Sequence, residues 1–345
     1  MRTFLTGGTG FIGQRIAPRL LARGWDVTAL VRRLDSPQTR ALQQLGVRLA
    51  PGDVTDRESM RPHMTGAELV IHGAAVYEFG VAAAARESMT AINVGGTDNV
   101  LSLAAELRVP RTVYVSSIMA LGDSGNLPRD ESYARATEPR TWYERTKMES
   151  HAVALRHAAQ GLPLVIVAPS AVVGPNDHSI WGYFIRSYLN RILPGMAWGA
   201  ACRQNPAHVD DVAEGIALAA ERGAPGELYL LCGETRTMRE HLGFWAAYPG
   251  AIHPKVWLPP RLAEALFAPA EPLLRRFGLP AFISRESVAA GAMNLDYSSE
   301  KASRDLGYRW RSAELMWRDT FQGELALLAA RPPRAPLRDC LRPVD

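Results

Sequence analysis

The chain has 345 residues, of which 47% are hydrophobic and 21% are charged, and its formal net charge at pH 7 is +4. This length accommodates one large domain or two lobes, and the composition is typical of a globular protein. The small, dispersed positive charge argues against a nucleic-acid partner, and the lack of any run of about 18 apolar residues argues against a membrane partner.

The three cysteines, Cys202, Cys232 and Cys340, are widely spaced and form no C-x-x-C pair. This pattern argues against a disulfide framework and against a zinc site, and it fits a reducing compartment. The N-terminus leads directly into a strand pattern without signal-peptide character. We therefore predict a cytoplasmic protein with no metal site.

The first strand and the first helix flank a glycine-rich turn at residues 6–13, TGGTGFIG. In such a turn one glycine permits the tight bend, one lets the backbone approach a pyrophosphate, and one lets the helix pack on the strand. Free amides at the helix N-terminus also favour phosphate. An ordinary glycine-rich turn is the alternative. On the dinucleotide interpretation, the cofactor contacts come from Gly7, Gly10, Phe11, Ile12 and Gly13.

Strand and helix patterns alternate through the first two thirds of the chain. Strands are expected at 26–31, 47–50, 67–71, 111–115, 164–167 and 227–231, and helices at 38–45, 83–107, 142–160, 180–193 and 208–222. This alternation predicts an α/β fold, a Rossmann-type doubly wound parallel sheet. Helices separated by prolines follow, and they indicate a smaller, mainly helical C-terminal substrate lobe.

The composition also suggests domain boundaries. We assign residues 1–175 plus about 205–232 to the dinucleotide-binding Rossmann domain, and about 176–204 plus 233–330 to the substrate-binding lobe. Residues 331–345 are rich in proline and arginine, which predicts a loosely ordered tail. In such a sheet the ligand binds at the carboxyl ends of the strands.

The second predicted strand ends at Val31 and is followed by Arg32 and Arg33. An acidic residue at this point would bind the adenosine ribose hydroxyls of NAD, whereas guanidinium groups match a phosphate in geometry and charge. We therefore predict that Arg32 and Arg33 bind the 2′-phosphate of NADP, and that NAD is the less favoured cofactor. The alternative is a pair of solvated arginines in an arginine-rich chain.

Two other strand ends are expected to contact the cofactor. Asp53 can accept a hydrogen bond from the adenine while the backbone of Val54 meets the ring. The alternative role of Asp53 is a helix cap, for which Asp56 is the better candidate. His72, at the end of the fourth strand, is expected to be a packed histidine. The next residues are small and let the backbone approach the cofactor ribose, Ala74 and Ala75.

Tyr143 and Lys147 lie four residues apart in a helical pattern, so they share one helix face. A tyrosine exchanges protons poorly near neutral pH unless a nearby positive charge stabilises its phenolate, and Lys147 supplies such a charge. Only three of the 39 basic residues are lysines, which favours a need for an ammonium group at this position. A chance Y-x-x-x-K on an amphipathic helix is the alternative.

Ser116 and Ser117 end the fifth strand, at the ligand edge of the sheet. A hydroxyl group there can hold a substrate oxygen while a proton is exchanged, and a simple turn serine is the alternative. Asn93 lies within a helical run, where asparagine has poor propensity. Its side chain is expected to bind a helix carbonyl or a water.

Taken together, these segments resemble the extended short-chain dehydrogenase/reductase superfamily, within the NAD-dependent epimerase/dehydratase family. The resemblance covers almost the whole chain, in TGGTGFIG at 6–13, GDVTD at 52–56, HGAA at 72–75, NVGGT at 93–97, YVSS at 114–117, YERTK at 143–147, HVDDVAEG at 208–215 and DYSSEKASRDLGY at 296–308. The segment VAPSAVVGPND, at 167–177, is most similar to the dihydroflavonol-reductase-like branch, because sugar epimerases usually carry Arg-Pro where this chain has Ala168-Pro169.

The resemblance implies a role for each candidate residue. Tyr143 would be the general acid/base, Lys147 would tune the tyrosine pKa and bind the ribose, and Ser117 would hold the substrate oxygen. Asn93 would support the proton relay, and Pro169 would contact the cofactor. We therefore expect an NADP-dependent oxidoreductase that reduces a ketone or aldehyde. The alternatives are a nucleotide-sugar epimerase or dehydratase and a non-catalytic dinucleotide-binding regulator.

Two further expectations concern partners. By resemblance, the helices at 83–107 and 142–160 form the faces of a homodimer. His208, Asp210 and Asp211 could suggest metal ligands, but a helix start and a histidine packed between the lobes explain them better.

The candidate substrate lobe is rich in aromatic residues, which line pockets for apolar ligands and also fill protein cores. They are Trp181, Tyr183, Phe184, Tyr188, Trp198, Phe244, Trp245, Trp257, Phe267 and Phe282. We therefore expect a small, largely apolar carbonyl substrate. A nucleotide sugar would need a second diphosphate clamp, and the candidates for it are Arg203, Arg236 and Arg239.

Overall fold

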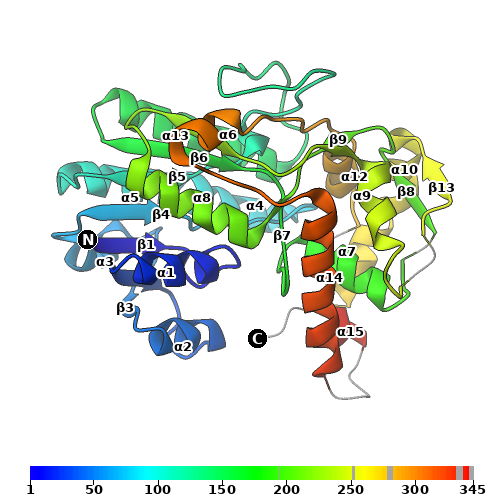
Figure 1. The fold of residues 1–345 in the computed structure, drawn as a ribbon, viewed down its shortest axis with the longest axis horizontal. Coiled ribbons are helices and arrows are strands. Elements are labelled where there is room, and N and C mark those ends of the chain that lie inside the picture. Colours follow the sequence, from blue (N-terminus) through cyan, green and yellow to red (C-terminus); the bar gives the residue numbers. More distant parts are fainter. Residues whose placement is uncertain (194, 251–252, 278–282, 332–336, 342–345) are drawn as a thin grey trace.

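The computed structural model describes residues 1–193, 195–250, 253–277, 283–331 and 337–341. At its centre lies a seven-stranded sheet with the order β11-β6-β5-β4-β1-β2-β3, and its strand pairs are parallel (Figure 1). Its strands are β1 (Arg2–Thr6), β2 (Asp26–Val31), β3 (Arg48–Pro51), β4 (Leu69–His72), β5 (Thr112–Val115), β6 (Leu164–Pro169) and β11 (Leu228–Leu231). The chain order reverses between β1 and β4, so the predicted doubly wound Rossmann-type sheet is confirmed.

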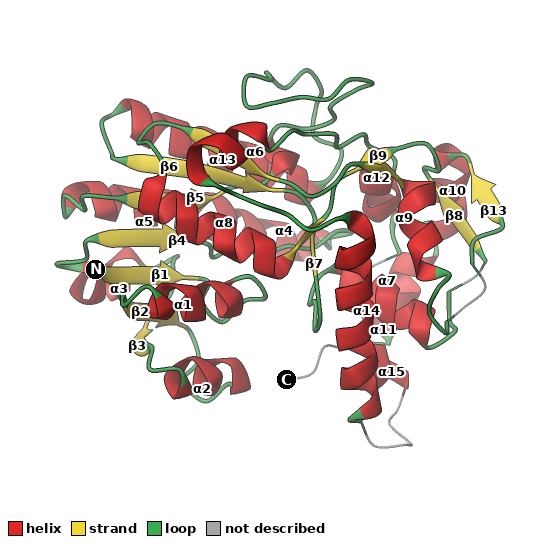
Figure 2. Cartoon of the chain, in the orientation of Figure 1, coloured by secondary structure: helices red, strands yellow, loops and turns green. Residues whose placement is uncertain are grey.

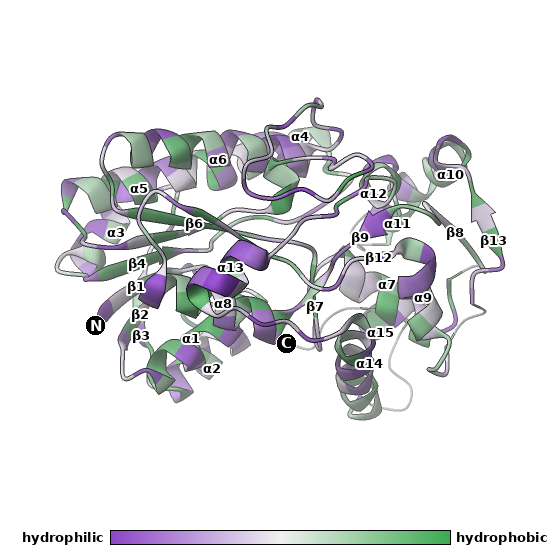
Figure 3. Ribbon diagram, turned by 45° about the horizontal axis from the view of Figure 1, so that its top comes forward, coloured by the Kyte–Doolittle hydropathy of each residue, from purple (hydrophilic) through white to green (hydrophobic). Residues whose placement is uncertain are grey.

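Helices cover both faces of this sheet, because its strands are apolar on both sides. In β1, Leu5 packs in one core cluster and its neighbour Phe4 in the other. One face is covered by α1 (Gly13–Ala22), α2 (Pro37–Gln44) and α8 (Val209–Arg222), and the other by α3 (Arg57–Met64), α5 (Gly96–Glu106) and α6 (Trp142–Ala159). The central strands are green, hence hydrophobic, along much of their length in Figure 3.

The predicted helix at 83–107 is interrupted. It consists of α4 (Ala83–Thr90), a π-helical turn (Ala91–Gly95) and α5. Such a turn inserts an extra residue into the helical ladder and is frequent at functional sites. Here it surrounds Asn93, whose side chain is buried.

The second lobe lies beside the carboxyl ends of the sheet strands (Figure 2). Its helices are α7 (Ile180–Leu189), α9 (Met238–Trp245), α10 (Pro260–Phe267), α11 (Ala270–Arg276), α12 (Arg285–Gly291) and α14 (Ala313–Ala329). Short strands join them, namely β8 (Met196–Trp198) with β13 (Val256–Leu258), β9 (Arg203–Gln204) with β12 (Arg236–Thr237), and β7 (Val172–Val173) with β10 (Ala207–His208). The predicted smaller helical lobe is therefore present.

Three details differ from the simplest expectations. The helix expected at 180–193 ends at Leu189, and Arg191 adopts a left-handed backbone with φ of 58°. The helix α13 (Glu300–Leu306), expected in the substrate lobe, contributes Ala302 and Leu306 to the core cluster on the sheet face that α1 and α8 cover. Within the predicted tail, the structure describes α15 (Leu337–Leu341), and 332–336 and 342–345 lie outside the described residues.

None of the helices in the described parts of the chain combines the length and the hydropathy that a bilayer crossing requires.

Candidate functional site

The glycine-rich turn leaves no room for side chains. Gly7 has a φ of 77°, and a Cβ atom there would lie 2.6 Å from the carbonyl carbon of Gly73. A Cβ atom on Gly13 would lie 2.0 Å from the carbonyl oxygen of Gly7. No side chain caps the start of α1, so the positive end of its helix dipole is open to an anion. These features fit a dinucleotide pyrophosphate.

A cavity of about 450 Å³ extends from this turn into the second lobe. It runs past the carboxyl ends of β1, β4, β5 and β6, where a ligand is expected in such a sheet. Ten of the predicted catalytic and cofactor-binding residues line it, namely Gly7, Gly10, Phe11, Ile12, Gly13, Ala75, Ser117, Tyr143, Lys147 and Pro169.

The remaining candidate cofactor residues lie outside this cavity, at neighbouring strand ends. Arg32 is solvent-exposed directly after β2, and the exposed Arg33 pairs with Asp35 at 3.5 Å. Ala74 donates its backbone amide to the hydroxyl of Thr6 at 3.3 Å. Because β2 lies beside β1, both arginines are at the sheet edge that carries the glycine turn.

In the loop after β3, both acidic residues accept hydrogen bonds from residues that follow them closely in the sequence. The carboxylate of Asp53 accepts hydrogen bonds from the amide and hydroxyl of Thr55, both at 2.8 Å. Asp56 caps α3 through the amides of Glu58 and Ser59, as expected. Val54 is buried. A contact between Asp53 and adenine therefore has to use the carboxylate oxygen that the turn leaves free.

Tyr143 and Lys147 lie on the first turns of α6, which Thr141 caps through the amide of Glu144. Both side chains are buried. The Nζ atom of Lys147 donates to the carbonyl oxygen of Val115 at 3.1 Å and to the hydroxyl of Tyr114 at 3.3 Å. The last two residues of β5 therefore hold this ammonium group close to Tyr143, as the spacing of Tyr143 and Lys147 predicts.

The electrostatics of Tyr143 are a balance of opposed effects. Burial raises the pKa of its phenol, whereas the charge of Lys147 and the hydroxyl of Ser117 lower it, and the net direction is upward. The phenol is therefore protonated at neutral pH, and burial outweighs the lowering of its pKa that we expected from Lys147. The tyrosine ring is also held by Tyr77 and Phe79, whose centroids lie 4.7 and 5.8 Å away in edge-on geometry.

The two serines at the end of β5 differ in their contacts. Ser117 accepts a hydrogen bond from the amide of Met119 at 3.2 Å and faces Tyr143. Ser116 has its hydroxyl 2.8 Å from Nδ1 of the buried His151. The geometry therefore favours Ser117 as the hydroxyl available to a substrate oxygen.

Asn93 bridges the π-helical turn and its surroundings. Its Oδ1 atom accepts from the amide of Val76 at 2.7 Å, and its Nδ2 atom donates to the carbonyl of Val76 and to the hydroxyl of Thr146, both at 3.0 Å. The expected partner of its side chain was a helix carbonyl or a water. The structure instead shows a loop carbonyl and a hydroxyl of α6, so Asn93 joins the β4 loop to the helix that carries Tyr143.

Sequence reasoning missed Tyr77, Phe79 and Tyr114. The first two lie in the loop after β4 and reach Tyr143 only because the sheet brings that loop to α6. Tyr114 had a signal, because it lies in β5 three residues before Ser117 and its side chain lies on the face of the sheet that α6 covers.

The second lobe supplies an apolar wall. Six of the predicted aromatic residues line the cavity, namely Trp181, Phe184, Tyr188, Trp198, Trp245 and Phe267. Of the others, Tyr183 and Trp257 face arginines and Phe244 packs in a core cluster, while Phe282 lies outside the described residues. The aromatic composition therefore contributes both to the pocket and to the core.

The arginines proposed as a diphosphate clamp face elsewhere. Arg203 pairs with Asp296 at 2.6 Å, Arg236 pairs with Glu234, and Arg239 lies over the ring of Trp257. Among the described residues that line the cavity, Lys147 is the only lysine or arginine.

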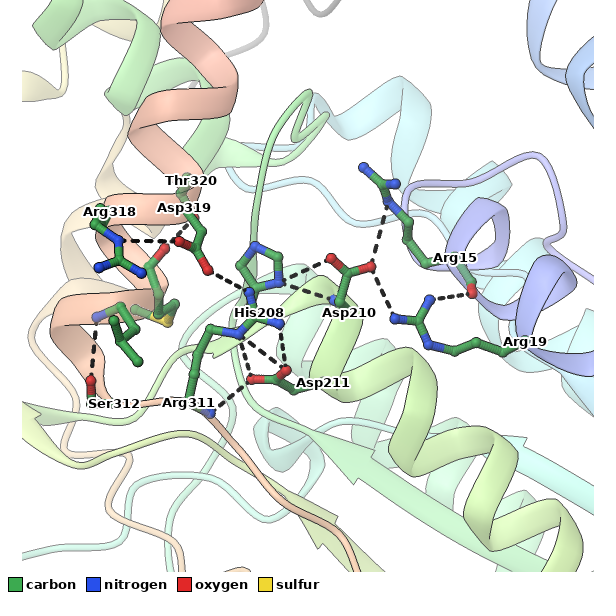
Figure 4. Close-up of polar contacts among 12 residues, drawn as sticks. Arg15, Arg19, His208, Asp210, Asp211, Arg311, Ser312, Arg318, Asp319 and Thr320 are labelled. Atoms are coloured by element: carbon green, nitrogen blue, oxygen red, sulfur yellow. Dashed lines mark hydrogen bonds and ion pairs between the residues drawn. The ribbon is translucent and has the colours of Figure 1, made fainter. Parts of the chain in front are cut away.

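The segment at 208–215 joins the two lobes, as Figure 4 shows. His208 is buried and its Nδ1 atom accepts the amide of Asp210 at 3.2 Å. Asp211 receives three hydrogen bonds from the guanidinium of Arg311, which precedes α14, and Asp210 pairs with Arg19 of α1. The helix-start and packing explanation of this motif is therefore supported, because its carboxylates are engaged by arginines.

Comparison with known proteins gives a consistent picture. The model of the NAD dependent epimerase/dehydratase family matches residues 3–232. Sterol demethylase protein B of Methylococcus capsulatus is 34% identical over 80% of this chain and 83% of its own length. A Synechocystis sp. protein named as a candidate dihydroflavonol 4-reductase is 33% identical over 88% and 89%. A 4-hydroxy-2-methyl-3-oxo-4-farnesyl-3,4-dihydroquinoline-1-oxide ketoreductase of Stigmatella aurantiaca is 31% identical over 90% and 92%.

Solved structures share the whole architecture. The dTDP-glucose 4,6-dehydratase DesIV of Streptomyces venezuelae, solved with NAD and TYD bound, is 25% identical with a TM-score of 0.76. The similarity covers 96% of this chain and 99% of the other.

Proposed function

This chain belongs to the NAD-dependent epimerase/dehydratase family, and we propose that it acts there as an NADP-dependent reductase of a ketone or aldehyde. The proposed substrate is a small, largely apolar molecule. One observation carries this proposal: a single cavity joins Tyr143, Lys147 and Ser117 to an aromatic wall, and its described lining contains no second lysine or arginine. A nucleotide sugar carries two phosphates, which such a lining would leave without a cationic partner.

The residues of the glycine turn suit the proposed cofactor. Gly7, Gly10 and Gly13 admit the pyrophosphate, the start of α1 offers its amides, and Lys147 binds the ribose. Arg32 and Arg33 are proposed to bind the 2′-phosphate from the neighbouring strand end. NADPH supplies the hydride for the carbonyl carbon when it is bound in this site.

The protein supplies the proton and the orientation. Tyr143 donates its phenolic proton to the carbonyl oxygen as that oxygen becomes an alkoxide, and the nearby ammonium of Lys147 stabilises the resulting phenolate. Ser117 hydrogen-bonds the same substrate oxygen. Asn93 acts indirectly, since it fixes the first turns of α6 through Thr146.

The names of the relatives agree with an apolar substrate. They refer to a sterol, to a dihydroflavonol and to a farnesylated quinoline ketone. A homodimer formed through α4, α5 and α6 and a cytoplasmic location are parts of the same proposal, carried by the family resemblance alone.

The test is a comparison of turnover and thermal stabilisation with NADP(H) present. Aromatic and alicyclic ketones and aldehydes form one panel, and UDP-, GDP- and dTDP-sugars form the other. The proposal expects NADPH consumption with members of the first panel. Turnover confined to a nucleotide sugar would replace it with an epimerase or dehydratase function, and tight cofactor binding without turnover in either panel would favour a regulator.

A further inference from the structure

Two consecutive helices of the second lobe expose large apolar side chains to solvent. In α10, Leu262 and Leu266 are 54% and 52% exposed. In and after α11, Leu273 and Phe277 are 55% and 65% exposed. Each pair is four residues apart and therefore lies on one face of its helix. Both helices belong to the lobe on the right of Figure 2.

The internal packing of the protein does not require this apolar surface. The helix α11 buries none of its residues, and α10, which packs against α12, buries Ala263 alone. Single exposed leucines are common on protein surfaces, whereas several large apolar side chains exposed on two consecutive helices are typical of an interaction site. We call the exposed surface of Leu262, Leu266, Leu273 and Phe277 the α10–α11 face.

The segment that carries the α10–α11 face has more basic than acidic residues. Between residues 253 and 277 the exposed charged residues are Lys255, Arg261 and Arg276. The acidic residues of this segment are only partly exposed, and Glu271 pairs with Arg275 at 3.7 Å. Exposed apolar side chains with exposed cations close to them in the sequence complement a surface that is apolar inside and anionic at its edge.

We propose that the α10–α11 face binds the surface of an anionic lipid bilayer, with both helices lying in the interfacial plane. An interfacial helix inserts its apolar side chains at the boundary of the acyl chains, while its basic residues contact lipid phosphates. This inference departs from the expectation of no membrane partner. That expectation considered spanning segments, and a helix that lies on the surface needs none.

The position of α10 gives the contact a use. Phe267 ends α10, lines the candidate substrate cavity and packs on Trp198 with centroids 5.4 Å apart. Its neighbour Leu266 is exposed on the proposed lipid face. One helix therefore separates the bilayer from the cavity, a short path for an apolar substrate that partitions into lipid. This use rests on the proposed function, whereas the lipid contact itself does not.

The contact is tested by flotation of the full chain with vesicles of phosphatidylcholine containing phosphatidylglycerol, and with vesicles of phosphatidylcholine alone. We expect binding to the anionic vesicles that weakens as salt increases. The variant Leu262→Glu with Leu266→Glu should lower the affinity by at least about tenfold, because two leucines that insert into the bilayer in our proposal become charged. Arg261→Ser with Arg276→Ser should lower it about fivefold for each arginine removed.

The matched control is Leu45→Glu with Leu127→Glu, which places the same charges on leucines of similar exposure outside the α10–α11 face. It should bind as the unchanged protein does. Thermal unfolding and NADP binding establish that each variant is folded.

Two results would overturn the proposal. One is the absence of vesicle binding by the unchanged protein. That result overturns the proposal even if the leucine variant abolishes a concentration-dependent dimer or the capture of another protein, because the α10–α11 face would then bind protein and not lipid. The other is an equal loss of binding in the control. Because flotation uses neither cofactor nor substrate, its failure is distinguishable from failure of the reductase proposal.

Discussion

The ammonium nitrogen of Lys147 lies 3.3 Å from the phenolic oxygen of Tyr114, within hydrogen-bonding distance. A further bond to the carbonyl of Val115 at 3.1 Å holds the same nitrogen at the end of β5. The sheet therefore positions the charge, and α6 positions the tyrosine that the charge acts on. The proton transfer that we propose for Tyr143 depends on both elements.

Replacement of Tyr143 by phenylalanine should remove the proton donor and leave the packing with Tyr77 and Phe79 in place. We expect kcat to fall by roughly a hundredfold or more, the scale of general acid–base catalysis, with little change in NADP affinity. Steady-state kinetics and fluorescence titration of NADPH measure the two quantities. Near-normal turnover would remove Tyr143 from the mechanism.

Lys147→Ala should weaken NADP binding as well as turnover. In our proposal Lys147 hydrogen-bonds the ribose, and its positive charge also lowers the pKa of Tyr143. The matched control is Tyr114→Phe, which removes one hydrogen bond of the lysine and keeps its charge. We expect the control to change turnover far less. A Lys147→Ala variant with reduced turnover and unchanged NADP affinity would contradict the ribose contact.

The preference for NADP should depend on Arg32, with a contribution from Arg33. A charge-assisted hydrogen bond is lost in Arg32→Ala, so the ratio of NADP to NAD affinity should fall roughly tenfold to a hundredfold. Arg32→Ala combined with Arg33→Ala should lower it further. Arg40→Ala, at another exposed arginine of the same region, serves as the control. If the ratio is the same in all three variants, the phosphate is bound elsewhere.

The stability of the protein should fall between pH 7 and pH 5, because several buried histidines are neutral in the fold. Burial lowers the pKa of His72 to about 3, and of His151 and His241 to about 4, from an ordinary value near 6.5. The unfolded chain therefore binds more protons in this window. Each such histidine costs about 2 kcal/mol of unfolding free energy at pH 5.

Asp177 opposes this trend, since burial raises its pKa to about 7 and the folded chain holds its proton as the pH falls. His241 has ring nitrogens that bond the indole N–H of Trp317 and the carbonyl of Gln204, and His241→Gln isolates the contribution of this histidine. Urea unfolding at pH 7 and at pH 5 should show a loss of unfolding free energy about 2 kcal/mol smaller in the variant than in the unchanged protein. An identical loss in both proteins would refute this assignment.

Local patterns in the sequence predicted much of the fold and of the site. The glycine turn and the spacing of Tyr143 and Lys147 are local features, so their geometry follows from a short stretch of chain. Contacts between distant segments were not predictable in this way. Tyr77 reaches Tyr143 through strand order and not through spacing.

Hydrogen bonds between candidate site residues and their neighbours were the other feature that the sequence did not reveal. The carboxylate of Asp53 is drawn into a turn with Thr55, which a residue pattern does not distinguish from a ligand contact. Asn93 likewise finds its partners in a loop 17 residues earlier and in α6. The π-helical turn that presents it has no signal in hydrophobic periodicity.

Isotope transfer distinguishes net hydride transfer from NADPH to an apolar carbonyl compound from the cofactor recycling of an epimerase. The protein is incubated with NADPH deuterated at C4 of the nicotinamide and with the best ketone or aldehyde of the panel, and the product is analysed by mass spectrometry. We expect an alcohol with one deuterium on the former carbonyl carbon, one NADP released for each alcohol formed, and a strongly reduced rate in Tyr143→Phe. A cofactor that stays bound and is regenerated, with deuterium exchanged only into a nucleotide sugar, would rule out the proposed reductase.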